Sequence, residues 1–304
     1  LQDNAQDGLP PGLGTEASPY EISTADQLET FRDLVNGEDG QTADTDAHAK
    51  LMNNIDLSSV CSKERGNWTP IGSDSRPYSG NFDGNNYTIS GLYIDTTADY
   101  QGLFGCLDQG GTVQNLTVSG SVKGDDYVGG VVGYNSGNVT VQNCTFSGDV
   151  SSSGDYVGGV VGYNSSSSTV ENCYKTGSVT SSGSPVGGVV GDNSGNVENC
   201  YNTGTVSDGG ISGGVVGDNY SSVTNCYNIG DVSGNGSDVG GVVGYNDSNG
   251  NVTGCYFLQT ADVNENLSGI GEGGGSATAK DDTAFHSGEV AYLLGEAWGQ
   301  SALG

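Results

Sequence analysis

The sequence predicts an all-β chain folded as a parallel β-helix, in which each turn of the coil stacks on the one before it. A string, Gly-Gly-Val-Val-Gly, recurs at intervals of 26 to 29 residues, starting at Gly129, Gly158, Gly187, Gly213 and Gly240. The first four copies are each followed by a Val-x-Asn-Cys segment and then by Gly-x-Val. These short segments are rich in Val, Thr and Tyr and lack helical periodicity, which favours strands. Three short strands fit one coil of this length, whereas a propeller blade needs about 40 to 50 residues.

About six regular coils are expected over residues 101–260, because a variant string, Gln101-Gly-Leu-Phe-Gly105, lies upstream of the first full copy. Stacked coils place equivalent residues in columns. Two columns of asparagine are expected, one at Asn143, Asn172, Asn199 and Asn225 and one at Asn135, Asn164, Asn193, Asn219 and Asn246. Asparagine tolerates the left-handed backbone of tight bends, and stacked amides can bond to each other. We therefore interpret these residues as scaffold.

Five of the seven cysteines form a further column, at Cys144, Cys173, Cys200, Cys226 and Cys255. Leu116 holds the equivalent place one coil earlier, which indicates a buried apolar position, and free cysteine behaves as a small hydrophobe. A reduced core column is preferred, although adjacent coils would also bring cysteines to disulfide distance. Cys61 and Cys106 lie outside the column and are the candidates for a disulfide. No Cys/His spacing typical of zinc occurs.

The flanking segments define the remaining parts of the chain. Residues 1–18 are expected to be a mobile leader. Residues 19–100 would form a cap, with a helix over residues 23–35, followed by irregular first coils. That helix has a Ser or Thr cap and apolar residues on one face, so it could cover the open end of the stack. Residues 261–280 are predicted to be a Gly-rich linker, and residues 281–304 a helical segment with a helix near residues 283–294.

The composition excludes several classes of partner. With 54 glycines and 33% hydrophobic residues, the chain suits a solenoid better than an ordinary globular core. It has 37 acidic and 8 basic residues, and its net charge is −29. Such acidity argues against nucleic acid and anionic membrane surfaces as direct partners. It is typical of secreted, cell-surface or salt-adapted proteins, and no membrane-inserted segment is expected.

The repeat resembles the GLUG repeat of bacterial and archaeal surface proteins. The resemblance rests on Val-Gly-Gly-Val-Val-Gly-Tyr-Asn followed by Val-x-Asn-Cys-Tyr-x-x-Gly-x-Val, and on lead-in motifs such as Asn54-Ile-Asp-Leu57 and Trp68-Thr-Pro-Ile-Gly72. It extends to the tail Phe285-His-Ser-Gly-Glu-Val-Ala-Tyr-Leu-Leu294. The resemblance implies a right-handed β-helix in an adhesin-like extracellular protein, and it implies no known chemistry.

No catalytic constellation is evident in the sequence. GLUG repeats also accompany metallopeptidases that cleave IgA, but this chain has only His48 and His286, and neither stands in a His-Glu-x-x-His motif. A β-helix enzyme acting on acidic sugars would need positive charge, yet residues 101–260 contain only Lys123 and Lys175 as basic residues. A glycan-active enzyme therefore remains the weakest of three alternatives.

Three groups of residues are weaker candidates for binding. Tyr174, Tyr201, Tyr227 and Tyr256 follow the cysteines and could stack on sugar rings, although packing between coils is the preferred interpretation. Asp192, Asp218 and Asp247 at bends could supply oxygen ligands to a structural Ca²⁺ ion, although solvated turns are preferred and no other cofactor is expected. Asn67, Asn86 and Asn251 stand in Asn-x-Ser/Thr sequences that permit N-glycosylation in a secreted protein.

We therefore expect a non-enzymatic extracellular or cell-surface solenoid that serves as an adhesion or ligand-presenting module. Its partner would be a host or cell-surface protein or a glycan. The main alternative is a structural subunit that self-associates into a filament or surface layer. Any binding function should lie where the repeats differ, for example at Tyr134 and Tyr163 against Asp192 and Asp218.

Overall fold

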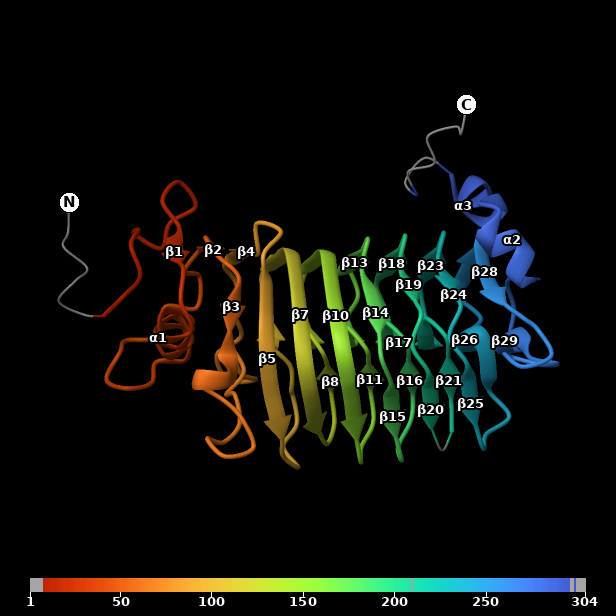
Figure 1. Ribbon diagram of the computed structural model, residues 1–304, viewed down its shortest axis with the longest axis horizontal. Coiled ribbons are helices and arrows are strands. Elements are labelled where there is room, and N and C mark those ends of the chain that lie inside the picture. The colour runs from red at the N-terminus through yellow and green to blue at the C-terminus, as the bar shows by residue number, and fades with distance from the viewer. Residues whose placement is uncertain (1–7, 209, 296–297, 299–304) are drawn as a thin grey trace.

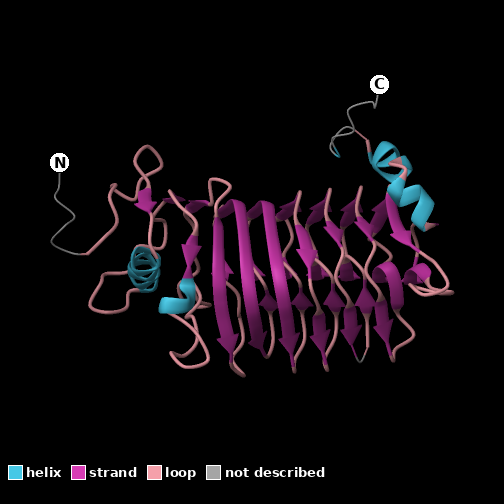
Figure 2. Ribbon diagram, viewed as in Figure 1, coloured by secondary structure: helices cyan, strands magenta, loops and turns pink. Residues whose placement is uncertain are grey.

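The chain forms a β-solenoid of about nine parallel turns. A computed structural model describes residues 8–208, 210–295 and 298 (Figure 1). Strands occupy the length of the rod, and helices lie only near its two ends in the part of the chain that is described (Figure 2). Every strand pair between successive turns is parallel, and residues one repeat apart are register partners.

The larger sheet contains most of the strands and runs along three sides of each regular turn. Its first side consists of β1 Tyr20–Ile22, β2 Ala49–Leu51, β4 Asn81–Asp83, β7 Thr112–Gly124, β10 Thr140–Ser152, β13 Thr169–Glu171, β18 Asn196–Glu198, β23 Ser222–Thr224 and β27 Asn251–Thr253. The long β7 and β10 continue onto the second side, with β3 Ile55–Asp56, β5 Thr88–Asp95, β14 Tyr174–Thr176, β19 Tyr201–Asn202, β24 Tyr227–Asn228, β28 Cys255–Leu258 and β30 Ala277–Lys280. The third side adds β15 Val179–Ser181, β20 Val206–Asp208 and β25 Val232–Gly234.

The smaller sheet is built from the glycine and valine strings and closes each turn. Its strands are β6 Phe104–Leu107, β8 Val128–Gly129, β9 Val132–Asn135, β11 Val157–Gly158, β12 Val161–Asn164, β16 Val186–Gly187, β17 Val190–Asn193, β21 Ser212–Gly213, β22 Val216–Asn219, β26 Val239–Asn246 and β29 Ser268–Gly273. The string is thus strand and bend, as predicted.

The predicted number of turns was too small. The count of about six relied on copies of the string, which begin at residue 101. The structure adds turns through β1, β2 and β4, which pair in sequence with β7. These turns were not counted because a helix and long loops separate their strands and no repeat string marks them.

Helix α1 (Ala25–Asn36) lies at the N-terminal end of the stack, as expected (Figure 1). It begins at Thr24, whose side chain accepts a hydrogen bond from the Gln27 amide, and ends at Gly37 with a φ of 67°. Its apolar face, Leu28, Phe31, Leu34 and Val35, is buried in the main core. The helix therefore completes the core where the first turn would otherwise be open. A short 3₁₀ helix, η2 (Leu57–Ser59), follows β3.

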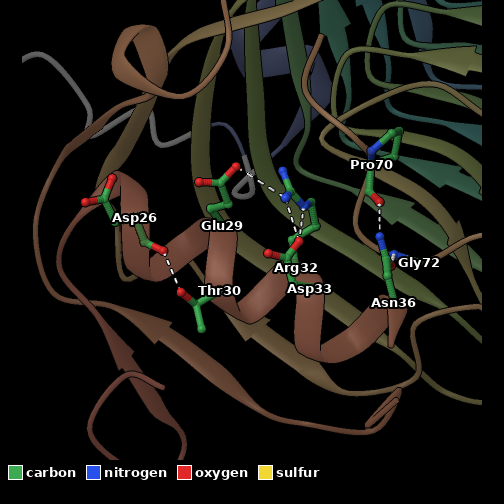
Figure 3. A network of polar contacts seen from close by, with 8 residues as sticks. All are labelled: Asp26, Glu29, Thr30, Arg32, Asp33, Asn36, Pro70 and Gly72. Carbon is green, nitrogen blue, oxygen red and sulfur yellow. Dashed lines mark hydrogen bonds and ion pairs between the residues drawn. The ribbon is translucent and has the colours of Figure 1, made fainter. Parts of the chain in front are cut away.

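Polar contacts anchor the end of α1 to the solenoid (Figure 3). The buried Asn36 side chain donates to the Pro70 carbonyl at 3.0 Å and accepts from the Gly72 amide at 2.9 Å. Arg32 pairs with Asp33 and with Glu29, and its guanidinium lies 5.0 Å from the ring centroid of Trp68. These contacts fix the helix against the loop that contains Trp68 to Gly72.

The leader is also more ordered than predicted. Residues 1–7 lie outside the described residues. Residues 8–18, however, pack on the first turns, because the Glu21 amide donates to the Pro11 carbonyl and the His48 amide donates to the Gly14 carbonyl, both at 2.7 Å.

The cysteine column lies in the core and its five side chains are buried and unbridged. Each thiol donates to the carbonyl two residues earlier, at 3.1 to 3.3 Å. The proposed disulfide between Cys61 and Cys106 is wrong, because both thiols are free. Cys61 follows η2 and bonds to the Gly91 carbonyl, whereas Cys106 belongs to β6 in the other sheet.

Both asparagine columns have the expected form. Asn143, Asn172, Asn199 and Asn225 have φ values of 53° or 54°, which is the left-handed conformation that asparagine tolerates. The second column is a continuous buried ladder in which each side-chain amide donates to the next, from Asn135 to Asn246, at 2.6 to 3.3 Å. These contacts join every regular turn to its neighbours.

The C-terminal end differs from prediction in two ways. Residues 261–280 are not a linker, because β29 pairs with β26 and β30 pairs with β28 to form a last turn. The single predicted helix over residues 283–294 is two helices, α2 (Asp282–His286) and α3 (Glu289–Leu294). Gly288, with a φ of 82°, separates them. The glycines of residues 261–280 were predicted to make a flexible linker, but they lie in the strands and bends of a packed turn.

Candidate ligand-binding surface

The predicted tyrosine column lies on the outside of the larger sheet. Tyr174, Tyr201 and Tyr227 stack with ring centroids 4.7 and 4.8 Å apart and nearly parallel planes. The C-terminal segment packs against this column. Trp298 lies 5.6 Å from Tyr201 and 5.0 Å from Tyr227, and α2 places Phe285 5.8 Å from Tyr227. Tyr256 also packs on this cluster. We therefore interpret Tyr201, Tyr227 and Tyr256 as the surface against which the C-terminal segment packs.

A second group of tyrosines lies at the smaller sheet and was not recognised as a column from the sequence. Tyr100, Tyr127 and Tyr156 each precede a strand of that sheet by one residue or a few, and each has a positive φ of 58° to 61°. A positive φ at an aromatic residue is strained and holds only where the surroundings determine it. The three rings stack with centroids 4.8 and 4.9 Å apart and interplanar angles of 4° and 8°.

Tyr134 and Tyr163 form a parallel column next to this one. They are register partners in β9 and β12, and their rings stack at 5.1 Å. Tyr134 meets Tyr127 edge to face at 5.3 Å, and Tyr163 meets Tyr156 at 5.9 Å. The five residues Tyr100, Tyr127, Tyr134, Tyr156 and Tyr163 are called the tyrosine face below. All five are half-buried, so their rings combine a packed side with a side open to solvent.

Glycines permit the close approach of the two tyrosine columns. A Cβ atom at Gly162 would stand 2.5 Å from the Gly133 carbonyl oxygen and 2.8 Å from the Tyr156 carbonyl oxygen. A Cβ atom at Gly133 would meet the Tyr127 carbonyl oxygen at 2.7 Å. The last glycine of each string therefore makes room for the bend that carries a tyrosine.

The ring hydroxyls are the parts of this surface best placed to bind a ligand. Because rings within a column stack on each other, their flat sides are largely occupied along the column. Among the described residues, no side-chain hydrogen bond is formed by the hydroxyls of Tyr100, Tyr127 or Tyr156. Burial and the neighbouring tyrosines raise the pKa of Tyr127 to about 12, so its hydroxyl is a hydrogen-bond donor at neutral pH.

A hollow of about 480 Å³ adjoins the N-terminal end of the tyrosine face and includes Tyr100 and Gln101 in its wall. Asn36 and Glu38 at the end of α1 and the Pro70 to Arg76 loop form much of the rest. Arg76 supplies the only basic side chain of its wall, against acidic Glu38, Asp74 and Asp99. The hollow thus offers a concave polar extension to the row of rings.

The column of Tyr134 and Tyr163 continues into two aspartates. Asp192 in β17 is the register partner of Tyr163, and Asp218 in β22 is that of Asp192. Their exposed fractions are only 5% and 6%. Burial and the adjacent Asp218 raise the pKa of Asp192 to about 7, and burial also raises the pKa of Asp218, although the Tyr220 hydroxyl donates to its Oδ2 at 2.9 Å.

The other predicted candidates are placed apart from this pair. Asp247 is not in the Asp192 column, because Tyr245 occupies the equivalent place. Instead, Asp247 lies in an exposed bend, where its Oδ1 accepts a hydrogen bond from the Asn249 amide. Within the described residues, no three His, Cys, Asp or Glu side chains cluster as metal ligands. Asn67, Asn86 and Asn251 are exposed, so attachment of a glycan stays a prediction.

Sequence reasoning also missed a buried lysine. Lys175 points into the core beneath the larger sheet, where its ammonium donates to the carbonyls of Gly148 and Thr176 at 2.5 Å and lies 5.6 Å from the Phe146 ring centroid. Burial lowers the pKa of Lys175 to about 7. Its column holds Phe146 and Asn202 in the adjacent turns. The only indication in the sequence was that the equivalent positions in the adjacent turns hold other residue types, Phe146 and Asn202.

Comparison with protein families locates the repeat. The GLUG motif matches residues 124–151, 153–180 and 182–207. These segments correspond to three successive turns, and their boundaries agree with the turns defined by the strand pairing. Residues 124–207 of the chain therefore contain three GLUG-motif repeats. The matched segments contain the bends and core strands described above, so the motif corresponds to the architecture of one turn.

Two curated proteins are similar to part of the chain. A candidate Gly-rich membrane protein of Evansella cellulosilytica is 35% identical over 139 residues, which is 43% of this chain and 15% of that protein. Halomucin of Haloquadratum walsbyi is 37% identical over 148 residues, which is 47% of this chain and 2% of that protein. The chain therefore spans a small fraction of the length of these relatives. No described helix is long and apolar enough to cross a membrane.

Solved structures support the fold. A candidate immunoglobulin A1 protease from Bacteroides ovatus superposes with a TM-score of 0.71 at 23% identity, covering 94% of this chain and 89% of that one. An IgA1 protease superposes with a TM-score of 0.55 at 16% identity, covering 85% of this chain and 21% of that one. At these identities the likeness establishes the shared solenoid.

Proposed function

We propose that the chain is a non-enzymatic, extracellular adhesion module that binds neutral, hydroxyl-rich glycans along the tyrosine face. The observation that carries the proposal is this face itself, five half-buried tyrosines on two stacked columns whose rings, among the described residues, make aromatic contacts only with one another. Solenoids commonly use extended surfaces of this kind for binding.

The charge of the chain narrows the class of ligand. A net charge of −29 repels sialylated, sulfated or uronic glycans and also nucleic acid. Tyrosine hydroxyls and the polar wall of the hollow can exchange hydrogen bonds with sugar hydroxyls. A neutral saccharide chain laid along the tyrosine face would meet a tyrosine hydroxyl at each of three successive turns, at Tyr100, Tyr127 and Tyr156, and repeated weak contacts add to the total affinity.

A surface location fits the same features. A dense carboxylate surface keeps an exposed protein soluble, and one relative is named as a membrane protein. The proposal includes binding without turnover, because the two aspartates with raised pKa values are more than nine-tenths buried. A substrate bond would have no direct approach to them.

A structural role in a filament is the second candidate. The outer edges of β29 and β30 pair with no further strand among the described residues, and such edges can pair with another chain. Light scattering and electron microscopy of the purified chain would detect ordered polymers at micromolar concentration, and their formation would favour this role over a discrete adhesion module.

The binding proposal is tested by applying the labelled chain to an array of neutral, sialylated and sulfated glycans. We expect binding confined to neutral glycans and a loss of at least tenfold in affinity for the double variant Tyr127→Ala/Tyr134→Ala. Tyr174→Ala is the matched control, because it removes an equally stacked tyrosine from the other sheet.

Two results would count against the proposal. Binding restricted to anionic glycans would contradict the charge argument. Equal affinity of the double variant and the control would remove the tyrosine face from the binding site.

A further inference from the structure

Asp192 and Asp218 lie one directly after the other on the outer side of the smaller sheet. They are in-register partners on the parallel strands β17 and β22, and Tyr163 and Tyr245 occupy the same position in the preceding and following turns. Parallel strands place such partners about 4.8 Å apart. The repeat therefore holds two carboxylates side by side, where the turns immediately before and after have a tyrosine ring.

Each of the two carboxylates has one buried oxygen without a partner. Oδ1 of each residue is inaccessible to solvent and has no hydrogen-bond partner, and the two residues are 95% and 94% buried by their exposed fractions of 5% and 6%. No lysine, arginine or histidine among the described residues forms an ion pair with either one. Buried carboxylates normally have a counter-charge or hydrogen bonds, because an unpaired buried charge is costly.

The negative environment extends beyond the pair. Asp247 and Asp238 add to the burial that raises the pKa of Asp218. Burial also raises the pKa values of Tyr156 and Tyr220, so their hydroxyls are uncharged at physiological pH. Tyr220 already occupies Oδ2 of Asp218. The buried carboxylate oxygens of the pair that lack a partner are the two Oδ1 atoms, one on each residue.

The spacing suits a shared metal ion better than a shared proton. A proton bridges two oxygens only at about 2.5 to 3.0 Å, which is shorter than the separation of about 4.8 Å between adjacent parallel strands. Calcium binds oxygen at about 2.3 to 2.6 Å. Two oxygens on opposite sides of one Ca²⁺ ion are therefore up to about 5 Å apart, which matches the separation of adjacent strands.

We propose that Asp192 and Asp218 are the two carboxylate ligands of a site for a divalent hard cation of the Ca²⁺ class. Two carboxylates balance the charge of one such ion. Calcium accepts six to eight oxygen ligands in flexible geometry, including water and carbonyl groups, so water or carbonyl oxygens complete the shell beyond the two side chains. The ion would pin two neighbouring turns together directly after the tyrosine face.

The site is tested by calorimetric titration of the chelator-treated full chain with CaCl₂ in 0.15 M NaCl. We expect a saturable site at one Ca²⁺ per chain in the wild type and at least a tenfold increase in Kd for Asp192→Asn and for Asp218→Asn. Asp247→Asn is the matched control, since it removes one acidic charge from a nearby exposed bend and should leave the site intact.

Thermal unfolding of the same four proteins gives a second readout. Added Ca²⁺ should raise the Tm of the wild type and of Asp247→Asn much more than that of Asp192→Asn and Asp218→Asn, because only a ligand bound to the folded state stabilises it. An equal shift in all four proteins would mean charge screening and would overturn the proposal. So would the absence of a saturable site in the folded wild type, whatever the stability of the variants.

Discussion

Both sheets of the solenoid carry stacked tyrosines, but the two sets have different surroundings. On the larger sheet, Tyr201 and Tyr227 lie beneath Trp298 and Phe285 of the C-terminal segment. On the smaller sheet, the tyrosine face has no such cover among the described residues, and its column continues into buried Asp192 and Asp218. The same repeat thus builds one tyrosine column that holds a segment of its own chain and one that is available to a ligand.

The comparison shows that the stacking of the rings alone does not decide whether a tyrosine column is covered or open to a ligand. Ring spacing within both columns is close to the strand spacing, 4.7 to 5.1 Å, because the backbone dictates it. What distinguishes them is the covering segment and the residues that replace tyrosine in later turns. Three measurements can break or sharpen this contrast.

The largest effect on folding stability is expected from Asp192 and Asp218, the carboxylates that interrupt the tyrosine column of the smaller sheet. The folded-state pKa of Asp192 is about 7, against an ordinary value of 3.8, so between these pH values the folded chain holds a proton that the unfolded chain has released. Stability therefore falls as pH rises from 4 to 7, by on the order of 4 kcal/mol from this residue.

Denaturant unfolding of wild type and Asp192→Asn across this pH range, with chelator present, isolates the contribution. The free energy of unfolding of the wild type should fall relative to the variant as pH rises. Saturating Ca²⁺ should reduce the difference at pH 7. A difference that does not change with pH would show that the Asp192 carboxyl is solvated in solution.

A smaller loss of stability is expected when a ring is removed from the covered tyrosine column of the larger sheet. Tyr227→Ala removes a ring that contacts Tyr201, Phe285 and Trp298, and loss of this half-buried contact should cost about 2 kcal/mol. Proteolysis should then cleave the chain near residues 281–295 faster than in the wild type. Tyr174→Ala, whose ring stacks on Tyr201 at the far end of the column, is the control and should leave cleavage unchanged.

The smallest change in stability is expected at the tyrosine face. Tyr127→Ala removes stacking and edge contacts from rings that remain half exposed, and should cost about 1 kcal/mol, while glycan affinity falls at least tenfold. Chemical denaturation and glycan binding measured on one preparation would separate the two effects. A stability loss above that of Tyr227→Ala would mean that this face is chiefly structural.

The scaffold was predictable because it is periodic. The strings, the left-handed asparagine bends and the cysteine column recur at fixed offsets, and stacking converts equal offsets into contacts. The variation between Tyr134 or Tyr163 and Asp192 or Asp218 was visible by the same alignment. Tyr127 and Tyr156 stand at equal offsets before the string, so a column there could have been recognised, whereas its edge-to-face packing on Tyr134 could not.

By itself, the sequence determined the parallel coil, its period and the residues that share each column, since hydrophobic spacing and bend residues act within one turn and repeat in the next. Only the tertiary structure decided that residues 261–280 form a last turn, that the C-terminal helices cover one tyrosine column, and that Asp192 and Asp218 are buried. The physical reason is that these outcomes depend on contacts between segments without a repeat relation. Such contacts follow from shape and burial in the assembled rod, which no local pattern encodes.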